Sequence, residues 1–239
     1  MSANQQVLAA SGGGKPDLVY TQLGIAASYQ TGIYQVSNAN FGTAASDRVI
    51  ISCLTVAAPR QGLITDRIGG INATLVSTGY QTNSTNSQGN NLGRASHMHY
   101  ATVPTGTSGL IKYTYSGTEE GSIGWGSINT TNSPSQIITI PVGSDGPTFT
   151  FSGINVDKGG VVVVGLGYEW ATTAVYEGGA AGLTWNGSGT PSQSYGLVKS
   201  GLNQHVIHIN CPTAVSNASL VISSFQNKFV VGQLAVWNP

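Results

Sequence analysis

The fold depends most on one stretch of the sequence, Lys158-Gly159-Gly160-Val161-Val162-Val163-Val164-Gly165-Leu166-Gly167-Tyr168-Glu169-Trp170. Four consecutive valines follow two glycines, and their β-branched side chains stiffen the backbone into an extended strand. Because both faces of this strand are apolar, we predict a central strand in a sheet that is covered on both sides. Burial of each valine stabilises the fold by about 1.5–3 kcal/mol, as an upper estimate. Gly165 and Gly167 indicate a bend, a bulge or the close approach of another backbone.

The composition predicts a single domain with few charges. The chain has 239 residues, of which 40% are hydrophobic and only 8% are charged, and its formal net charge is zero. Such a length suits one all-β domain, and the lack of a basic stripe argues against a nucleic-acid partner. The surface must consist mainly of Ser, Thr, Asn, Gln and Gly. This surface suits burial against neighbouring subunits, so we expect a homo-oligomer.

The sequence gives no sign of membrane insertion or of a secretion signal. No apolar run is long enough to span a bilayer, and the first six residues lack the order of basic, apolar and small residues that a signal peptide has. We therefore expect synthesis in a cytoplasm. Cys53 and Cys211 lie in strand-like runs far apart in the sequence, and we interpret them as buried free thiols, although their spacing does not exclude a disulfide.

Residues 1–17 are predicted to form a flexible N-terminal arm. This segment has few large apolar side chains, and Gly12, Gly13, Gly14, Lys15 and Pro16 cannot continue a helix or a central strand. Two interpretations stay open. The arm is either a disordered tail or an assembly tether that orders on a partner subunit.

Residues 18–239 are predicted to form one antiparallel two-sheet β-sandwich of the jelly-roll type. Runs of β-forming residues bounded by turn residues recur along the chain, and none has a helical period. Examples are Arg48–Val56, Leu63–Ile68, Thr148–Ile154 and His205–Cys211. Gly69-Gly70 predicts a tight hairpin. The polar stretch Tyr80–Gly93 predicts a surface loop. A parallel β-helix is the main alternative fold, but no short repeat of fixed length supports it.

Several of these segments, taken in order, resemble β-sandwich domains of virion proteins from tailed bacteriophages and prophages. The resemblance is carried by Asn40-Phe41-Gly42-Thr43-Ala44-Ala45-Ser46-Asp47-Arg48-Val49-Ile50-Ile51, Ile68-Gly69-Gly70-Ile71-Asn72-Ala73-Thr74-Leu75-Val76, His99-Tyr100-Ala101-Thr102-Val103-Pro104-Thr105-Gly106-Thr107-Ser108-Gly109, Ile111-Lys112-Tyr113-Thr114-Tyr115-Ser116-Gly117, the valine strand and Gly182-Leu183-Thr184-Trp185. It covers residues 40–239.

This resemblance implies a non-enzymatic virion component that is made in the cytoplasm of a bacterial host. The implied partners are other virion proteins, such as the major capsid or tail proteins. Domains of this type occur on heads, tails and fibres, so the position on the particle stays open, and no binding residue carries over.

Histidine is the only residue type whose spacing hints at a metal site. His97 and His99 lie two residues apart in a predicted strand, so their side chains point to the same face. His205 and His208 are three apart and should face opposite sides of their strand. A structural metal needs three or four ligands, and no neighbouring Cys, Asp or Glu completes a set. We therefore predict no metal and no cofactor.

The sequence also gives little support for catalysis. Two pairs of carboxylates could suggest glycoside hydrolysis, namely Glu119-Glu120 and Glu169 with Glu177. Such acids on turns are usually solvated and not catalytic. Serines, histidines and aspartates could be combined into a triad on paper. The Gly-x-Ser-x-Gly turn between a strand and a helix is absent. We predict that the protein is not an enzyme.

Aromatic residues are the best candidates for ligand contact. Tyr and Trp offer flat apolar faces with a hydrogen-bonding edge, which suits both carbohydrate and subunit interfaces. We expect Tyr80, Trp170 and Tyr176 to be exposed and to contact a glycan or a subunit. Trp185 and Tyr168 alternate with core-like residues and are expected to pack inside the sandwich.

The sequence thus favours a structural accessory protein of a tailed-phage virion, displayed as capsid decoration or as a tail appendage and acting through subunit contacts. The alternative is a carbohydrate-binding adhesin that recognises host-surface glycans. A glycan hydrolase is the weakest of the three hypotheses.

Overall fold

The computed structural model of the protein describes residues 16–28, 32–57, 63–85, 91–115, 121–140, 148–169, 181–197, 202–223 and 229–239. Within these ranges the chain forms seventeen strands and no helix. The strand pairs are antiparallel. The predicted all-β class and the predicted antiparallel sandwich are confirmed.

The strands form four sheets, which we name by their place in the molecule. The outer N-terminal sheet has the spatial order β2 (Ile33–Asn40), β8 (Ser108–Tyr115), β4 (Leu63–Ile68), β5 (Ile71–Asn72). The inner N-terminal sheet has the order β1 (Thr21–Ser28), β9 (Gly121–Asn129), β3 (Arg48–Ala57), β7 (Asn91–Thr102), β6 (Thr74–Thr85). The inner C-terminal sheet has the order β10 (Gln136–Thr139), β17 (Phe229–Trp237), β12 (Gly160–Glu169), β15 (Leu202–Cys211), β14 (Ser192–Leu197). The outer C-terminal sheet has the order β11 (Thr148–Val156), β16 (Val215–Ser223), β13 (Gly182–Trp185).

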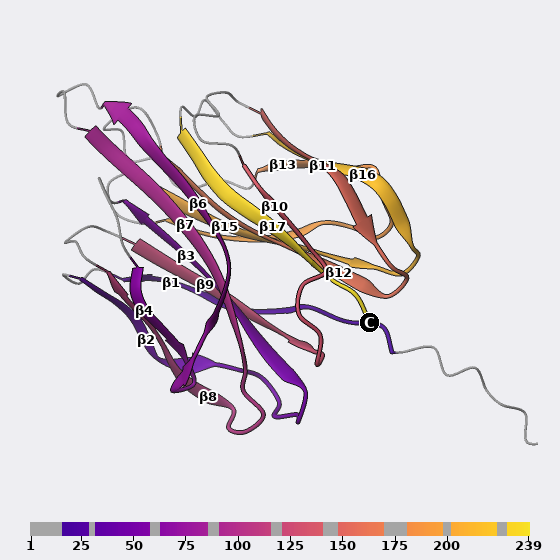
Figure 1. Cartoon of the computed structure of the whole chain (residues 1–239), viewed down its shortest axis with the longest axis horizontal. Helices are drawn as coiled ribbons and strands as arrows, with labels where there is room; N and C mark the ends of the chain where they lie inside the picture. Colours follow the sequence, from indigo (N-terminus) through magenta and orange to yellow (C-terminus); the bar gives the residue numbers. More distant parts are fainter. Residues whose placement is uncertain are drawn as a thin grey trace, which may run out of the picture.

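The four sheets stack as two sandwiches that share a central interface. In Figure 1 the indigo and magenta strands of the N-terminal half lie on one side, and the orange and yellow strands of the C-terminal half lie on the other. The outer and inner sheets of each half enclose a core of their own, and the two inner sheets pack against each other. We call these units the N-terminal sandwich and the C-terminal sandwich.

Both sandwiches have the same connectivity. The order β1-β9-β3-β7-β6 of the inner N-terminal sheet matches the order β10-β17-β12-β15-β14 of the inner C-terminal sheet. The order β2-β8-β4 likewise matches β11-β16-β13 in the outer sheets, and only β5 has no counterpart. In each half the first strand pairs with the last, and the chain crosses between the two sheets, as in a jelly roll.

The valine stretch forms β12, which lies in the middle of the inner C-terminal sheet between β17 and β15. Val161 and Val163 face the central interface, whereas Val162 and Val164 face the core of the C-terminal sandwich. All four valines have no exposed surface. The prediction of a central strand covered on both sides is confirmed.

Three apolar layers hold the stack together. The N-terminal core contains many aromatic side chains, among them Tyr34, Phe41, Tyr113, Tyr115 and Trp125. The central layer is built from residues of both halves, including Met98, Val163, Val206 and Trp237. The C-terminal core is mainly aliphatic, with Phe149 and Phe151 as its buried aromatic residues. Because these layers are contiguous across β3 and β12, the two sandwiches pack as one body.

Glycines allow the two inner sheets to approach closely. A Cβ added at Gly165 would lie 2.7 Å from the Cys53 sulfur, and one at Gly167 would collide with the Thr55 side chain. A Cβ at Gly79 of β6 would lie 2.9 Å from the backbone nitrogen of Gly232 in β17. Of the bend, bulge or close backbone approach predicted at Gly165 and Gly167, the structure has a close approach, and the side chains of Cys53 and Thr55 make it instead of a backbone.

Two details differ from the sequence interpretation. The single predicted pair of sheets is present twice, because an alternating pattern fixes which residues face a core but not how many cores exist. The predicted loop Tyr80–Gly93 is wrong in its bounds, since residues 80–85 extend β6 and residues 91–93 begin β7. The Gly69-Gly70 hairpin is confirmed, with φ values of 62° and 81° that suit a tight turn with two positive φ angles.

Candidate functional site

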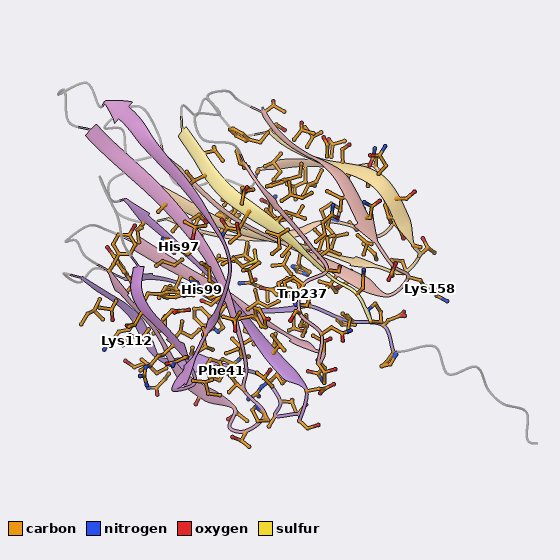
Figure 2. All side chains as sticks on the ribbon, viewed as in Figure 1. Phe41, His97, His99, Lys112, Lys158 and Trp237 are labelled. Carbon is orange, nitrogen blue, oxygen red and sulfur yellow. The ribbon has the colours of Figure 1, made fainter. Side chains whose placement is uncertain are left out.

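The most prominent group of reactive side chains lies inside the N-terminal sandwich. His97 and His99 of β7 point into its core, with ring centroids 6.1 Å apart, as the two-residue spacing predicted. Asp66 of β4 faces them, and its Oδ2 lies 3.2 Å from His99 Nε2. Tyr113 of β8 packs its ring 5.4 Å from the His99 ring. Ser52 of β3 is the cross-strand partner of His99. Figure 2 shows His97 and His99 one above the other along β7.

Burial keeps the two histidines neutral. Loss of water around the ring lowers the pKa of His97 from 6.5 to about 4. The same cause, followed by the nearby charge of His97, lowers the pKa of His99 to about 3. Burial raises the pKa of the Asp66 carboxyl, and a hydrogen bond from its own backbone offsets part of that rise. At neutral pH the cluster therefore contains two uncharged imidazoles beside the Asp66 carboxyl group.

The cluster has the residue types of a catalytic triad but not the access that catalysis requires. Ser52 is fully buried, and His99 retains 1% of its surface. His99 Nδ1 and His97 Nε2 lack hydrogen-bond partners among the described residues, whereas the Ser52 hydroxyl lies near the Tyr113 hydroxyl and offsets part of the rise in the Tyr113 pKa. A nucleophile must reach its substrate, and two sheets separate this one from solvent. The arrangement can stiffen a core and respond to acid, but it offers no surface for a substrate.

No metal centre forms in the described part of the chain. A search of these residues finds no group of three or more His, Cys, Asp or Glu side chains that could hold a metal ion. His205 and His208 face opposite sides of β15, as predicted from their spacing. His208 packs 4.9 Å from the Tyr20 ring, whereas His205 stacks on Tyr195 at 5.5 Å. Cys53 and Cys211 are buried and free, as predicted.

The structure describes few of the aromatic candidates. Trp170 and Tyr176 lie outside the described residues, in the connection between β12 and β13. Tyr80 is placed by its backbone alone, within β6 and paired with Ala95 of β7. Trp185 packs half-buried against the C-terminal core, as predicted, and its indole N–H donates to the Ser188 carbonyl at 2.9 Å. The side chain of Tyr168 is not described.

Tyr195 is an aromatic candidate of the sequence that was not among the three residues expected to be exposed contacts. It lies on the edge strand β14 with 46% of its surface exposed. Its ring stacks on His205 with an interplanar angle of 23°. Gln193 on the same strand lies beside His205, with Oε1 3.2 Å from Nδ1. A tyrosine that follows three polar residues, Ser192-Gln193-Ser194, is the signal that could have placed its ring at the surface.

Arg48 is another residue whose role was missed. It is 1% exposed, and its guanidinium carbon lies 5.9 Å from the centre of the Phe41 ring. Its N–H groups donate to four backbone carbonyls at 2.8–3.0 Å, those of Gly42, Val103, Thr105 and Gly106. Burial lowers the pKa of the guanidinium, which nonetheless stays protonated. Arg48 thus fixes the β2–β3 and β7–β8 connections to each other.

Of the predicted assembly arm, Gly12, Gly13, Gly14 and Lys15 lie outside the described residues, and Pro16 is exposed. Residues 16–20, which we call the lead segment, cross from the arm onto the C-terminal sandwich before β1 begins. The Leu18 N–H donates to the Gly159 carbonyl at 2.7 Å, and the Tyr20 N–H donates to Asn210 Oδ1 at 2.9 Å. Leu18 and Tyr20 are buried in the central layer. The lead segment therefore fixes the place where the arm leaves the body.

A surface hollow of about 270 Å³ lies beside the lead segment. Its lining is mostly apolar and comes from four parts of the chain: Asp17, Leu18, Val19, Gly159, Gly189, Asn210, Cys211 and Pro212. Val19 is 60% exposed at its rim, the highest exposure among the large hydrophobic residues described. The hollow can accept apolar side chains and has no group suited to catalysis.

Comparisons of the chain with protein-family models, with curated proteins and with solved structures find no match. Among the described residues no helix has the length and apolar character needed to cross a membrane.

Proposed function

We propose that this protein is a non-enzymatic structural accessory protein of a tailed-phage virion. It is displayed on the particle as capsid decoration or as part of a tail appendage, and it acts by binding other subunits. Its partners are further copies of itself and other virion proteins. The N-terminal arm contributes to attachment.

The observation that carries this proposal is the exposed face of the outer C-terminal sheet. Strands β11, β13 and β16 contain no charged residue. The exposed positions of β11 are Thr148, Thr150, Ser152 and Asn155, and those of the neighbouring strands include Thr184 on β13 and Ser223 on β16. Burial of a charge costs several kcal/mol unless it is paired, whereas a hydroxyl needs only a hydrogen bond. This face is therefore well suited to lie against a neighbouring subunit.

The opposite face of the molecule has different chemistry. On the outer N-terminal sheet, Arg67 of β4 pairs with Lys112 of β8, so two positive charges lie side by side. Figure 2 places Lys112 at the outer side of that sheet. Adjacent like charges repel, and they favour a hydrated surface. The two outer sheets thus differ in the way expected of a protein with one docking face and one solvent face.

Two further observations support a binding role. Jelly rolls are common in viral capsid proteins and in lectins, although a fold alone does not select a function. The Ser52, His97, His99 and Asp66 cluster is enclosed between sheets, so these reactive side chains serve the core. The ordered resemblance of residues 40–239 to phage virion domains favours the virion over a lectin.

Lysine substitutions on the two outer sheets test the proposal. We expect Thr150→Lys combined with Thr184→Lys to lower incorporation into particles at least tenfold, because two charges would have to be buried at the contact. Thr65→Lys, at an exposed position of β4, is the matched control and should leave incorporation unchanged. Equal incorporation of the two variants would contradict the proposed docking face, and absence of the wild-type chain from particles would contradict the virion role.

The alternative is an adhesin that binds host-surface glycans, and Tyr195 is the observation that favours it. An exposed ring on an edge strand is a suitable platform for a sugar, and it is held in place by stacking on His205. A glycan array should be probed with the wild type and with Tyr195→Ala, Tyr80→Ala, Trp170→Ala and Tyr176→Ala. Saturable binding that one of these changes abolishes would favour the adhesin, and a protein that acts only through packing shows none.

A further inference from the structure

The inner N-terminal sheet ends in a long strand with an open edge. β6 stands last in its sheet and pairs with β7 alone among the described strands. It has twelve residues, more than any other edge strand that the structure describes. An edge strand presents a row of unpaired N–H and C=O groups, which proteins usually protect with lysine, proline or a covering segment. β6 contains neither a charged residue nor a proline.

Part of this edge is regular enough to accept another strand. Bulges interrupt the pairing of β6 with β7 between Leu75 and Ser77 and between Gln81 and Ser84. Such bulges twist a strand and disturb its edge. Between them, the residues Ser77–Gln81 pair with β7 in unbroken register. Their outward backbone groups therefore keep the spacing that a further antiparallel strand requires.

Strand β10 lies beside β6 in the next layer, so the edge is two sheets thick. Near the start of β6, the Tyr100 hydroxyl of β7 lies 3.0 Å from the hydroxyl of Ser133, which precedes β10. Further along β6, Gly79 lies close against Gly232 of β17, whose carbonyl accepts a hydrogen bond from the Ile140 N–H just after β10. β10 is itself the edge strand of the inner C-terminal sheet and is also uncharged.

Large hydrophobic side chains are exposed along this edge. Leu75 of β6 is 52% exposed, and Ile137 of β10 is 45% exposed. Ile71 of β5, which a single residue joins to β6, is 42% exposed. Of the large hydrophobic side chains described on β1 and β14, which form the opposite edge, only Tyr195 is exposed. Apolar side chains that gather on a surface mark a site of interaction.

We propose that β6 binds β6 of a second copy of this chain as an antiparallel strand, centred on Ser77–Gln81, so that the two inner N-terminal sheets join into one. The contact is isologous, because each copy offers the same edge and a twofold axis relates the two copies. This inference rests on the proposed function in one respect, since it names the contact through which copies of the chain bind one another.

Strand direction favours this twofold contact over a head-to-tail one. The strands of the inner N-terminal sheet alternate in direction, so its two edge strands, β1 and β6, run the same way. Head-to-tail association would pair β6 with β1 of the next copy as parallel strands, which are slightly less stable than antiparallel ones. A twofold axis normal to the sheet makes the new pair antiparallel and keeps each layer in line with its counterpart.

The size and the charge of the edge also suit a second copy. The twelve residues of β6 extend about 40 Å, and two layers about 10 Å apart present a strip about 20 Å wide with their side chains. Each copy therefore buries about 800 Å², which is the area that a standard stable interface takes from each partner. An edge that meets itself brings like charges together, and neither β6 nor β10 has a charge to repel its counterpart.

Sedimentation of the purified full-length chain tests the contact. We expect the wild type to form a dimer. Leu75→Lys combined with Ile137→Lys should raise its dissociation constant at least tenfold, because exposed lysines on an edge oppose strand pairing. Tyr195→Lys is the matched control, since it places a lysine at a similarly exposed position on the opposite edge, and it should leave the dissociation constant unchanged.

Amide hydrogen exchange of the wild type shows whether the strands pair, without any substitution. In peptides from residues 74–85, exchange should slow at least tenfold between a dilute, monomeric sample and a concentrated, dimeric one, because the outward N–H groups of β6 gain partners. Peptides from β1 should exchange at the same rate in both samples.

Three results would overturn the inference. They are a wild type that stays monomeric at high concentration, an equal weakening of the dimer by Tyr195→Lys, and unchanged exchange in residues 74–85 when the dimer forms. Particle incorporation is measured separately. A monomeric chain that is incorporated normally would reject the β6 contact and leave the virion role standing, and a dimer that particles lack would do the reverse.

Discussion

The two sandwiches share their connectivity and differ in what fills them. In the N-terminal sandwich, Leu54 of β3 pairs with His97, and Ser52 pairs with His99. At the corresponding places in the C-terminal sandwich, Leu166 of β12 pairs with His205, and Val164 pairs with Ile207. One histidine position is thus common to both halves. The Ser52–His99 pair of the N-terminal core is replaced by two aliphatic residues in the C-terminal core.

This difference shows that the strand order does not depend on the chemistry of the core. Both halves share the alternation of buried and exposed residues and the turn residues between strands. The buried polar atoms, however, differ between the two cores. A core with unpaired polar atoms is less stable than an apolar one of the same shape. The N-terminal sandwich should therefore depend more on individual anchoring contacts.

The largest effect is expected at Arg48. Arg48→Met should lower the free energy of unfolding by about 3–5 kcal/mol, because four backbone carbonyls lose a charged donor that is almost fully buried. Arg48→Lys should recover little, since an ammonium cannot reach all four. In the other half, Asn238 accepts from the Asp157 N–H at 2.9 Å, and Asn238→Ala should cost only about 1 kcal/mol. Urea denaturation measures the free energy of unfolding of all three variants. Similar losses of stability in Arg48→Met and Asn238→Ala would contradict the difference between the two halves.

Acid should weaken the fold through its buried histidines. The pKa is lowered to about 4 for His97 and His205 and to about 3 for His99, mainly by burial. Because the unfolded chain binds these protons near pH 6.5 and the folded chain does not, stability falls as the pH drops from about 6.5 toward about 4, by about 1.4 kcal/mol per pH unit for each histidine. His97→Gln and His205→Gln should reduce this slope equally, and His99→Gln should extend the reduction to lower pH. Denaturation at about pH 7 and about pH 5 checks this, and an unchanged slope in the variants would contradict it.

The smallest effect is expected where the two cores differ by a single side chain. Ser52→Ala should change stability by less than about 1 kcal/mol, because it removes little volume and only a weak contact between the Ser52 and Tyr113 hydroxyls. Val164→Ala at the corresponding position should cost about 1–3 kcal/mol, since it leaves a cavity in an aliphatic core. Thermal unfolding of the two variants compares them directly. A loss at Ser52 equal to that at Val164 would mean that the hydroxyl is part of a satisfied network.

Much of the local structure could be predicted from residues that act through their own strand. The valine run of β12 has two apolar faces, and the structure covers both. The spacing of His97 and His99 placed both rings on one face, because side chains alternate along a strand. Gly165 and Gly167 indicated a close approach, since a strand interior rarely has two positions without side chains.

Other features depend on partners that lie far away in the sequence. Arg48 binds carbonyls 55–58 residues further along the chain as well as that of Gly42, and a charge at the start of a strand gives no sign of this. Residues Gln81–Thr85 are polar and still extend β6, because pairing with β7 stabilises them more than their own β propensity does. The duplication of the sandwich was missed because corresponding strands share an alternating pattern but few identical residues.

A density map of the intact particle, at a resolution that separates the sheets, tests the proposed function most directly. The account predicts that the uncharged face of β11, β16 and β13 lies against a neighbouring subunit and that the face bearing Arg67 and Lys112 lies in solvent. Particles in which the charged face makes the contact, or particles that lack this chain, would contradict it.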